Sequence, residues 1–369
     1  MVIRYDDMRV DRLLIEGYKK QLEVDLKRIN GLNDIDILLA EFEKIFAAYI
    51  GTNYAVALNS GTDALLLSLL ILNVGKGDSV IIPNITYPAV PLSVIYAGAK
   101  PILVDIKEED LEIDENLIEK NITKNTKAII AVHMFSRPCN IDKIIEVAKK
   151  NKLFVIEDCC QAESSEYSGK KLGSFGDLSC FSFSYYKPLS SCGGGGGMVC
   201  FNKERYKKIL NYTQVWKDDD NLLKIGRRFA RMYLLDLIAI KVKFKYIREI
   251  IKSRMQLKKI YNSEMPNLGA IKVLEENNAV KTVLQNYTIF TNLRDQLYPY
   301  LKSSGIVAQY PYTPINMMNI FKKFAIDKKF PASKRYFDTA LHLPLFSFMK
   351  QEDCFKVISC VRDFFMQHK

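Results

Sequence analysis

The segment LFVIEDCC, residues 153–160, gives the clearest indication of the fold. It begins as an apolar run, which is followed by two acids, Glu157 and Asp158. Similar apolar runs lie at 55–60, 78–83, 101–106, 128–135, 179–185 and 197–202, and helical patterns at 63–74, 88–98 and 141–151 fall between some of them. Short β-branched and aromatic runs separated by helices are typical of a parallel sheet covered on both faces. We therefore predict a mostly parallel α/β core from about residue 50 to residue 205.

The rest of the chain has a different pattern. Residues 228–259 are helical and basic, and a smaller α+β part follows beyond 283, with a helix at 293–305, an extended stretch at 306–314 and a last helix at about 351–367. We predict three parts: a large domain with an N-terminal helical arm (1–216), a basic amphipathic helical segment (217–260) and a C-terminal α+β domain (261–369).

Composition excludes several classes of protein. The 369 residues are 48% hydrophobic and 26% charged, which is ordinary for a globular protein and excludes a disordered or fibrous one. No apolar run reaches the ~18 residues of a membrane span, and charges interrupt the N-terminus too often for a secretory signal. The eight cysteines lack CxxC spacing, which indicates buried cytosolic thiols, and three widely spaced histidines make a histidine-based metal site improbable. We expect a cytoplasmic protein without a metal.

Three groups of residues carry potential chemistry. Asn59 to Asp63 connect a strand to a helix, where glycine and free N–H groups suit a phosphate, although a plain N-capped turn has the same residues. Asp158 ends a strand and could hold a cationic ring nitrogen, or simply cap a helix. Lys187 follows the aromatic strand FSFSYY and precedes a glycine run, where burial would make it a Schiff-base nucleophile instead of a surface lysine. Together they predict a pyridoxal-phosphate site.

Several motifs in order resemble one known family. SGTDAL (60–65), PNITYPA (83–89), AVHMF (131–135), VIEDCCQA (155–162), GSFGDLSCFSFSYYK (173–187) and LHLPLF (341–346) are similar to motifs of the DegT-type sugar-nucleotide aminotransferases. The resemblance implies pyridoxal-phosphate fold type I, with a mostly parallel seven-stranded sheet.

The resemblance also implies roles for single residues. Lys187 matches the lysine that binds the cofactor aldehyde and moves the proton, and Asp158 matches the acid that pairs with the pyridinium nitrogen. Gln161 matches the residue near the ring hydroxyl, and Tyr87 the aromatic that stacks on the ring. The phosphate cradle is matched by Gly61, Thr62 and Ser182. His133 could border the site or belong to the core, and we expect His342 to be structural.

The chain departs from the family pattern in three places. Lys187 is followed by Pro188 and then SSCGGGGG, where the family has Asn and an acid within the glycine-rich turn. The family's Gly-x-Asn-x-Arg-Met segment does not directly follow Trp216; Asn262-Ser263-Glu264-Met265 resembles it, which would make 217–260 an insertion and Asn262 a ligand of the neighbouring subunit's phosphate. The substrate-side HY-x-x-P-x-H pattern is also altered, and appears as Gln309-Tyr310, Pro314 and Asn316.

The basic segment accounts for most of the positive charge. The chain has a formal net charge of +11, and residues 217–260 hold 13 Lys and Arg against 5 Asp and Glu. Such a helix could be buried by protein as a core-capping or subunit-interface hairpin, which we favour, or lie on an anionic membrane. It could also attract the substrate's diphosphate. No nucleic-acid-binding motif is recognised, so we expect no nucleic-acid partner.

The sequence therefore predicts a pyridoxal-phosphate-dependent aminotransferase. By resemblance, it moves an amino group from an amino acid, glutamate, to a keto sugar attached to a nucleotide, works as a homodimer and feeds the synthesis of a surface polysaccharide or glycoconjugate. Two alternatives are a non-catalytic binding or scaffold protein that kept the fold, and a related sugar dehydratase. The dehydratases replace the Schiff-base lysine, whereas this chain keeps Lys187.

Overall fold

The computed structural model describes most of the chain. The described residues are 2–4, 14–185, 187–191, 193–200, 202–213, 230–268, 270–276, 279–326 and 328–368. Residues 217–229 of the predicted basic segment lie outside them. The remaining description concerns these residues only.

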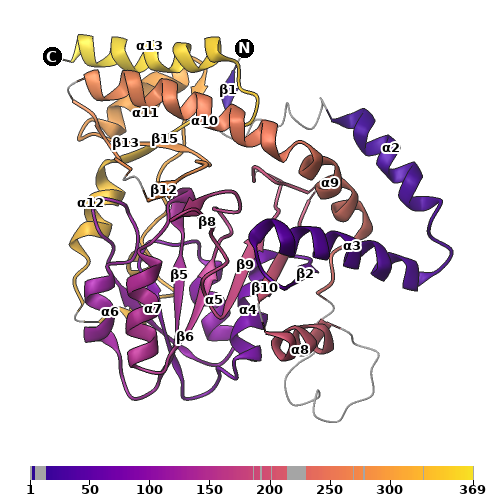
Figure 1. The fold of residues 1–369 in the computed structure, drawn as a ribbon. Coiled ribbons are helices and arrows are strands. Elements are labelled where there is room, and N and C mark those ends of the chain that lie inside the picture. Colours follow the sequence, from indigo (N-terminus) through magenta and orange to yellow (C-terminus); the bar gives the residue numbers. More distant parts are fainter. Residues whose placement is uncertain are drawn as a thin grey trace.

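A seven-stranded sheet forms the centre of the larger part (Figure 1). Its strands are β2 (Tyr54–Leu58), β3 (Ser79–Pro83), β4 (Lys100–Val104), β5 (Thr126–Val132), β6 (Phe154–Asp158), β9 (Leu178–Ser182) and β10 (Gly196–Cys200). They lie in the order β2-β10-β9-β6-β5-β3-β4. Only β10 runs antiparallel to its neighbours, whereas the pairs from β9 to β4 are parallel. The predicted mostly parallel seven-stranded sheet is confirmed.

Helices cover both faces of this sheet. One face packs on α4 (Gly61–Ile71), α5 (Ala89–Tyr96) and α8 (Lys203–Thr213), and the other on α3 (Leu32–Ile50), α6 (Glu115–Asn121) and α7 (Ile141–Lys150). In β3, Val80 and Ile82 belong to the first core and Ile81 to the second, because successive side chains of a strand point to opposite faces. This double coverage explains why the strands are continuous apolar runs.

The C-terminal part is a smaller α+β unit. It contains the three-stranded sheet β11 (Lys272–Val273), β13 (Tyr287–Phe290) and β15 (Ala340–Leu343), together with α11 (Arg294–Ser303), α12 (Pro331–Thr339) and α13 (Gln351–Gln367). The stretch predicted to be extended, 306–314, has a regular strand only at β14 (Ile306–Val307), which pairs with β1 (Ile3–Arg4). Three further short strands, β7 (Glu166–Tyr167), β8 (Lys170–Lys171) and β12 (Val280–Lys281), form a sheet beside the core.

The described end of the basic segment forms two helices, α9 (Leu234–Lys245) and α10 (Ile247–Glu264). Helix α9 packs against α2 (Ile15–Leu26) and α3, and α10 packs against α13 (Figure 1). Most apolar residues of α9 are covered by the protein itself, namely Leu237, Ile238, Ala239, Ile240 and Val242, whereas Leu235 is 62% exposed. This burial agrees with the core-capping interpretation and leaves little of the apolar face on which the membrane interpretation relied.

Many charges of this segment are also matched internally. Arg231 pairs with Glu43, Lys241 with Asp25 and Lys258 with Glu276. Its positive excess is thus partly neutralised by acids outside the segment, and two of them, Glu43 and Asp25, lie far away in the sequence. Among the helices that the structure describes, none combines the length and apolarity needed for a membrane span.

Candidate active site

One pocket gathers seven of the eight predicted site residues. It encloses about 180 Å³ at the carboxyl ends of the strands, where open α/β sheets bind their ligands. The seven residues are Gly61, Thr62, Tyr87, Asp158, Gln161, Ser182 and Lys187. They come from segments separated by up to 126 positions in the sequence, so their meeting in one pocket is a property of the fold.

Lys187 lies in the connection between β9 and β10. Its residue is only 8% exposed, and its backbone N–H donates to Ser184 O at 2.9 Å. The N–H of Leu189 donates to the buried Glu163 at Oε1 (3.1 Å), which fixes the chain just after the lysine. Burial lowers the pKa of Lys187, opposed by the nearby Cys160, Glu163 and Asp158. A lowered pKa increases the fraction of neutral amine, the nucleophilic form.

Asp158 ends β6 and faces the same pocket. It is buried, and its Oδ1 accepts the N–H of Cys160 at 3.0 Å. The preceding acid, Glu157, points to the other side of the sheet, where it accepts the N–H groups of Gly173, Phe175 and Gly176. Alternation along the strand therefore gives the two neighbouring acids different surroundings.

The N-terminus of α4 forms another wall. Ser60 caps the helix by accepting the N–H of Asp63 at 3.0 Å. At Gly61, a Cβ would stand 2.8 Å from Cys160 Sγ and 3.1 Å from Phe181 O, so only glycine fits this close approach to β9. A helix N-terminus exposes N–H groups and a positive dipole end, which favour an anion.

Gln161, Tyr87 and Tyr312 form the side of the pocket toward the C-terminal part. Gln161 Oε1 accepts the N–H of Phe135 at 2.9 Å, and its Nε2 donates to Tyr312 Oη at 3.4 Å. The Tyr312 ring stacks on Phe135 and meets the half-exposed ring of Tyr87 edge-on, 6.0 Å between centroids. Tyr312 lies within the stretch predicted to be extended, 306–314, but its place in the pocket was not predicted.

Several other lining residues were also missed. They are Thr86, Cys160, Ser184, Gly194 and Gly195, together with the apolar wall residues Leu65, Ala89, Val90, Val132 and Met134. Thr86 and Ser184 could have been found, because both lie inside quoted motifs, Thr86 next to Tyr87 and Ser184 two residues after Ser182. The altered substrate-side residue Asn316 is not among the lining residues; it is paired with Asn84, whose Nδ2 donates to Asn316 Oδ1 at 2.8 Å.

The polar groups of the pocket match those needed to bind a phosphorylated aldehyde that contains a ring. It brings together a buried amine, a buried carboxylate and a helix N-terminus, which are the groups that pyridoxal phosphate requires. Within the described residues, Thr86, which lines the pocket, has a buried Oγ1 without a hydrogen-bond partner. Buried polar atoms normally have partners, so this hydroxyl is available to a polar ligand beside Tyr87.

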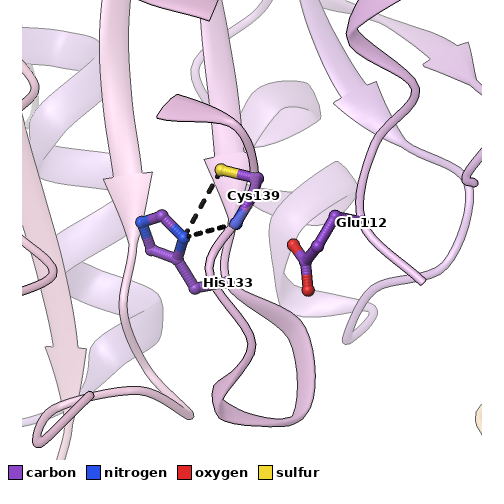
Figure 2. A group of neighbouring side chains, drawn as sticks. All are labelled: Glu112, His133 and Cys139. Carbon is purple, nitrogen blue, oxygen red and sulfur yellow. Dashed lines mark hydrogen bonds between the residues drawn. The ribbon is translucent and has the colours of Figure 1, made fainter. Parts of the chain in front are cut away.

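His133 borders the pocket and is fully buried, so both interpretations of it hold. Figure 2 shows its ring facing Cys139, with Glu112 close by. Its Nδ1 accepts the N–H of Cys139 at 3.2 Å, and its Nε2 is 3.1 Å from Glu157 Oε2. Two overlapping groups of side chains here are near enough to hold a metal ion, namely Glu112, His133 and Cys139, and His133, Glu157 and Cys159. The sequence spacing did not indicate either group.

Hydrogen bonds within the protein already use the His133 ring. Both of its nitrogens are engaged, with Cys139 and Glu157. Burial raises the pKa of the Cys139 thiol and of the Glu112 carboxyl well above their ordinary values, and a metal would have to displace both protons. His342 lies elsewhere, in the core, between Thr288 Oγ1 and Tyr336 Oη.

Asn262 is not among the residues lining this pocket. It is exposed on α10, and its Oδ1 accepts the hydroxyl of Tyr287 at 2.9 Å. Its contact with a neighbouring subunit's phosphate stays a prediction. Arg231, in the described end of the basic segment, forms a β-bridge with Leu58 at the end of β2.

Comparison with known proteins identifies the family. The sequence pattern of the DegT/DnrJ/EryC1/StrS aminotransferase family matches residues 37–362. The chain belongs to this family. It is therefore an aminotransferase, and the family implies pyridoxal phosphate as its cofactor.

Named relatives cover most of the chain. GDP-perosamine synthase of Escherichia coli O157:H7 is 31% identical over 339 residues, 89% of this chain and 90% of the relative. The dTDP-3-amino-3,4,6-trideoxy-alpha-D-glucose transaminase of Streptomyces venezuelae is 30% identical over 331 residues, 88% and 86% of the two chains.

Solved structures agree with the fold. S. venezuelae DesV, crystallised in complex with a ketimine intermediate, is 27% identical and has a TM-score of 0.90, with 99% of this DegT-family chain and 98% of that chain covered. A DegT DnrJ EryC1 StrS aminotransferase from Brucella abortus has a TM-score of 0.88 at 24% identity, with 97% of each chain covered. The predicted fold type is confirmed.

Proposed function

We propose that this protein transfers an amino group from an amino acid, glutamate, to a keto sugar carried by a nucleoside diphosphate. The observation that carries the proposal is the meeting of Lys187, Asp158 and the α4 N-terminus in one pocket. The nucleotide-linked substrate is supported by relatives named for GDP- and dTDP-linked amino sugars. A surface polysaccharide or glycoconjugate pathway is the corresponding destination of the product.

Pyridoxal phosphate, when bound, supplies an aldehyde that bonds to amines and a ring that accepts electrons as a C–H proton leaves. Lys187 Nζ would hold the cofactor and, once the donor amine displaces it, take up and return the proton. Asp158 would keep the ring nitrogen protonated. Gly61, Thr62 and Ser182 would hold the phosphate, and Tyr87 and Gln161 would orient the ring.

The substrate must enter from the open side of the pocket. Tyr87 is 49% exposed there, and Tyr185, which follows the Ser184 wall, is 48% exposed. Exposed aromatic rings at a pocket mouth are suited to contact a sugar or a neighbouring subunit. A homodimer that covers this mouth, in a cytoplasmic enzyme, is part of the proposal.

The two alternatives are less well supported. A dehydratase of this fold would lack the Schiff-base lysine, whereas Lys187 is buried in the pocket. A non-catalytic scaffold would not need the buried amine and carboxylate together, since each costs free energy to bury.

Borohydride trapping tests the proposal. The purified protein is mixed with pyridoxal phosphate, reduced with borohydride and digested, and the modified peptide is identified by mass spectrometry. We expect the label on Lys187, and we expect glutamate added before reduction to bleach the visible absorbance and abolish the label. A label on another lysine, or none, would contradict the assignment.

A variant of Lys187 distinguishes the role of the lysine from that of the rest of the pocket. Lys187→Ala should lose the covalent label but keep the fold, as measured by circular dichroism. Lys171, a partly buried lysine that pairs with Glu166 instead of facing the pocket, supplies the control variant Lys171→Ala, which should keep the label. Amino transfer to a panel of GDP-, UDP- and dTDP-linked keto sugars, detected by mass, would then identify the acceptor.

A further inference from the structure

The glycine-rich loop after Lys187 forms part of the pocket wall. Gly194 and Gly195 line the pocket, and Gly195 has a φ of +104°, which favours glycine. The Gly195 N–H donates to Asn59 O at 2.6 Å, and Gly195 O accepts the N–H of Phe183 at 2.8 Å. These bonds hold the inner side of the loop to the strand ends that carry Ser60 and Ser182. The position of the wall then depends on what covers its outer side.

One face of α9 covers that outer side. Asp236 Oδ1 accepts the N–H of Gly193 at 3.2 Å, and Lys243 Nζ donates to Ser190 Oγ. Between them, Ile240 Cδ1 is 3.6 Å from where a Cβ on Gly195 would stand. Spacings of four and three residues place the three side chains on the same helix face.

Both charges at this contact come from the helix. Residues 188–197 contain neither an acid nor a base. Lys243 is only 1% exposed, and a buried ammonium costs several kcal/mol unless hydrogen bonds compensate it. The buried ammonium of Lys243 therefore depends on hydrogen bonds to the groups that it contacts, among them Ser190.

The opposite side of α9 is held by the N-terminal helix α2. Lys241 Nζ is 2.8 Å from Asp25 Oδ1, and Lys245 Nζ donates to Gln21 Oε1 at 2.8 Å. Helix α9 thus lies between α2 and the loop, and the loop lies between α9 and the pocket. A change at Lys243 acts on the pocket side, and a change at Lys241 acts on the α2 side.

We propose that Asp236 and Lys243 are positioning residues that hold the loop, through Gly193 and Ser190, against the cofactor pocket. The inference rests on the proposed function in one respect, namely that the pocket binds pyridoxal phosphate. Loss of either side chain releases the outer side of the loop, so that the wall formed by Gly194 and Gly195 is no longer fixed.

The test compares Asp236→Ala and Lys243→Met with Lys241→Met, a matched lysine variant of the same helix. Three quantities are measured on the full chain: hydrogen exchange of the 188–200 peptide, the dissociation constant of pyridoxal phosphate from absorbance titration, and the melting temperature. We expect the first two variants to exchange faster in this peptide and to bind the cofactor roughly tenfold more weakly. Lys241→Met should lower the melting temperature but keep the dissociation constant within about twofold of wild type. Asp236→Asn, which keeps an acceptor oxygen, should restore most of the binding.

Two results would overturn the proposal. One is wild-type exchange and cofactor affinity in both Asp236→Ala and Lys243→Met. The other is an equal loss of affinity in Lys241→Met, which would show a general effect of helix stability. Failure of the wild-type protein to bind pyridoxal phosphate would instead contradict the proposed function, and hydrogen exchange would still test whether α9 holds the loop.

Discussion

Glu43 of α3 and Arg231, just before α9, form a largely buried ion pair with Nη1 and Oε1 2.6 Å apart. The same Glu43 oxygen accepts the N–H of Ala57 at 2.7 Å, in the middle of β2. Close by, the N–H of Asn59 donates to the carbonyl oxygen of Ala230, the residue before Arg231, at 2.9 Å. One carboxylate therefore ties α3 and the segment before α9 to the strand that leads into the pocket.

Removing the arginine should be costly. Arg231→Met leaves Glu43 buried without its cation, and we expect a loss of about 3–5 kcal/mol in the free energy of unfolding, measured with urea. The double variant Glu43→Gln/Arg231→Met removes both charges and should recover most of this loss. A single variant within about 1 kcal/mol of wild type would contradict the importance of the pair.

Gly61 should not tolerate a methyl group. Gly61→Ala places its Cβ against Cys160 Sγ and Phe181 O, and we expect a loss of about 1–3 kcal/mol together with weaker binding of pyridoxal phosphate. Gly75→Ala is the control, because its Cβ would meet only Ala97 O, at an ordinary 3.6 Å. Equal stabilities of the two variants in thermal unfolding would argue against a close-packed wall at Gly61.

The adjacent acids Glu157 and Asp158 should respond differently to the same change. Asp158→Asn removes the carboxylate of the pocket, so we expect kcat to fall by about 10²–10⁴ while the melting temperature changes little. Glu157→Gln should mainly lower the stability. Although burial alone raises the pKa of Glu157, hydrogen bonds from His133, Gly176 and Gly173 lower it, which means that the folded state stabilises its charge. Steady-state kinetics and thermal unfolding on both variants check this contrast.

His342 should make the protein sensitive to acid. Burial lowers its pKa from 6.5 to about 3, so below pH 6.5 the unfolded chain binds a proton that the folded chain excludes. The stability contribution is therefore complete above pH 6.5 and is lost as the pH falls toward 3, by up to about 1.4 kcal/mol per pH unit. In His342→Gln this dependence should be absent. Urea unfolding at pH 7.5, 6 and 5 measures it, and parallel curves for the two proteins would contradict the prediction.

Local patterns in the sequence were sufficient to predict the mostly parallel sheet and the groups around Gly61, Asp158 and Lys187, whereas Tyr87, Gln161 and Ser182 were predicted only through the family resemblance. Each strand of the core is a short apolar run, and Asp158 and Lys187 directly follow such runs, at the edge where strand ends meet. Tyr312 escaped prediction because its place in the pocket depends on how the C-terminal part folds over the sheet. The pairing of Lys241 with Asp25 likewise joins distant elements, so the charges in the described end of the basic segment could not be matched with their partners from the sequence.

The single reversed strand sets an order on the completion of the pocket. Within the main sheet, β2 pairs only with β10, so strand pairing joins β2, which leads into Ser60 and Gly61, to β9 only through residues 196–200. Closing such a non-local pairing needs both partners. During synthesis on the ribosome, this part of the sheet can therefore close only after residue 200 has emerged, and a nascent chain that stops before β10 carries the motifs for the cofactor on a sheet that is still open.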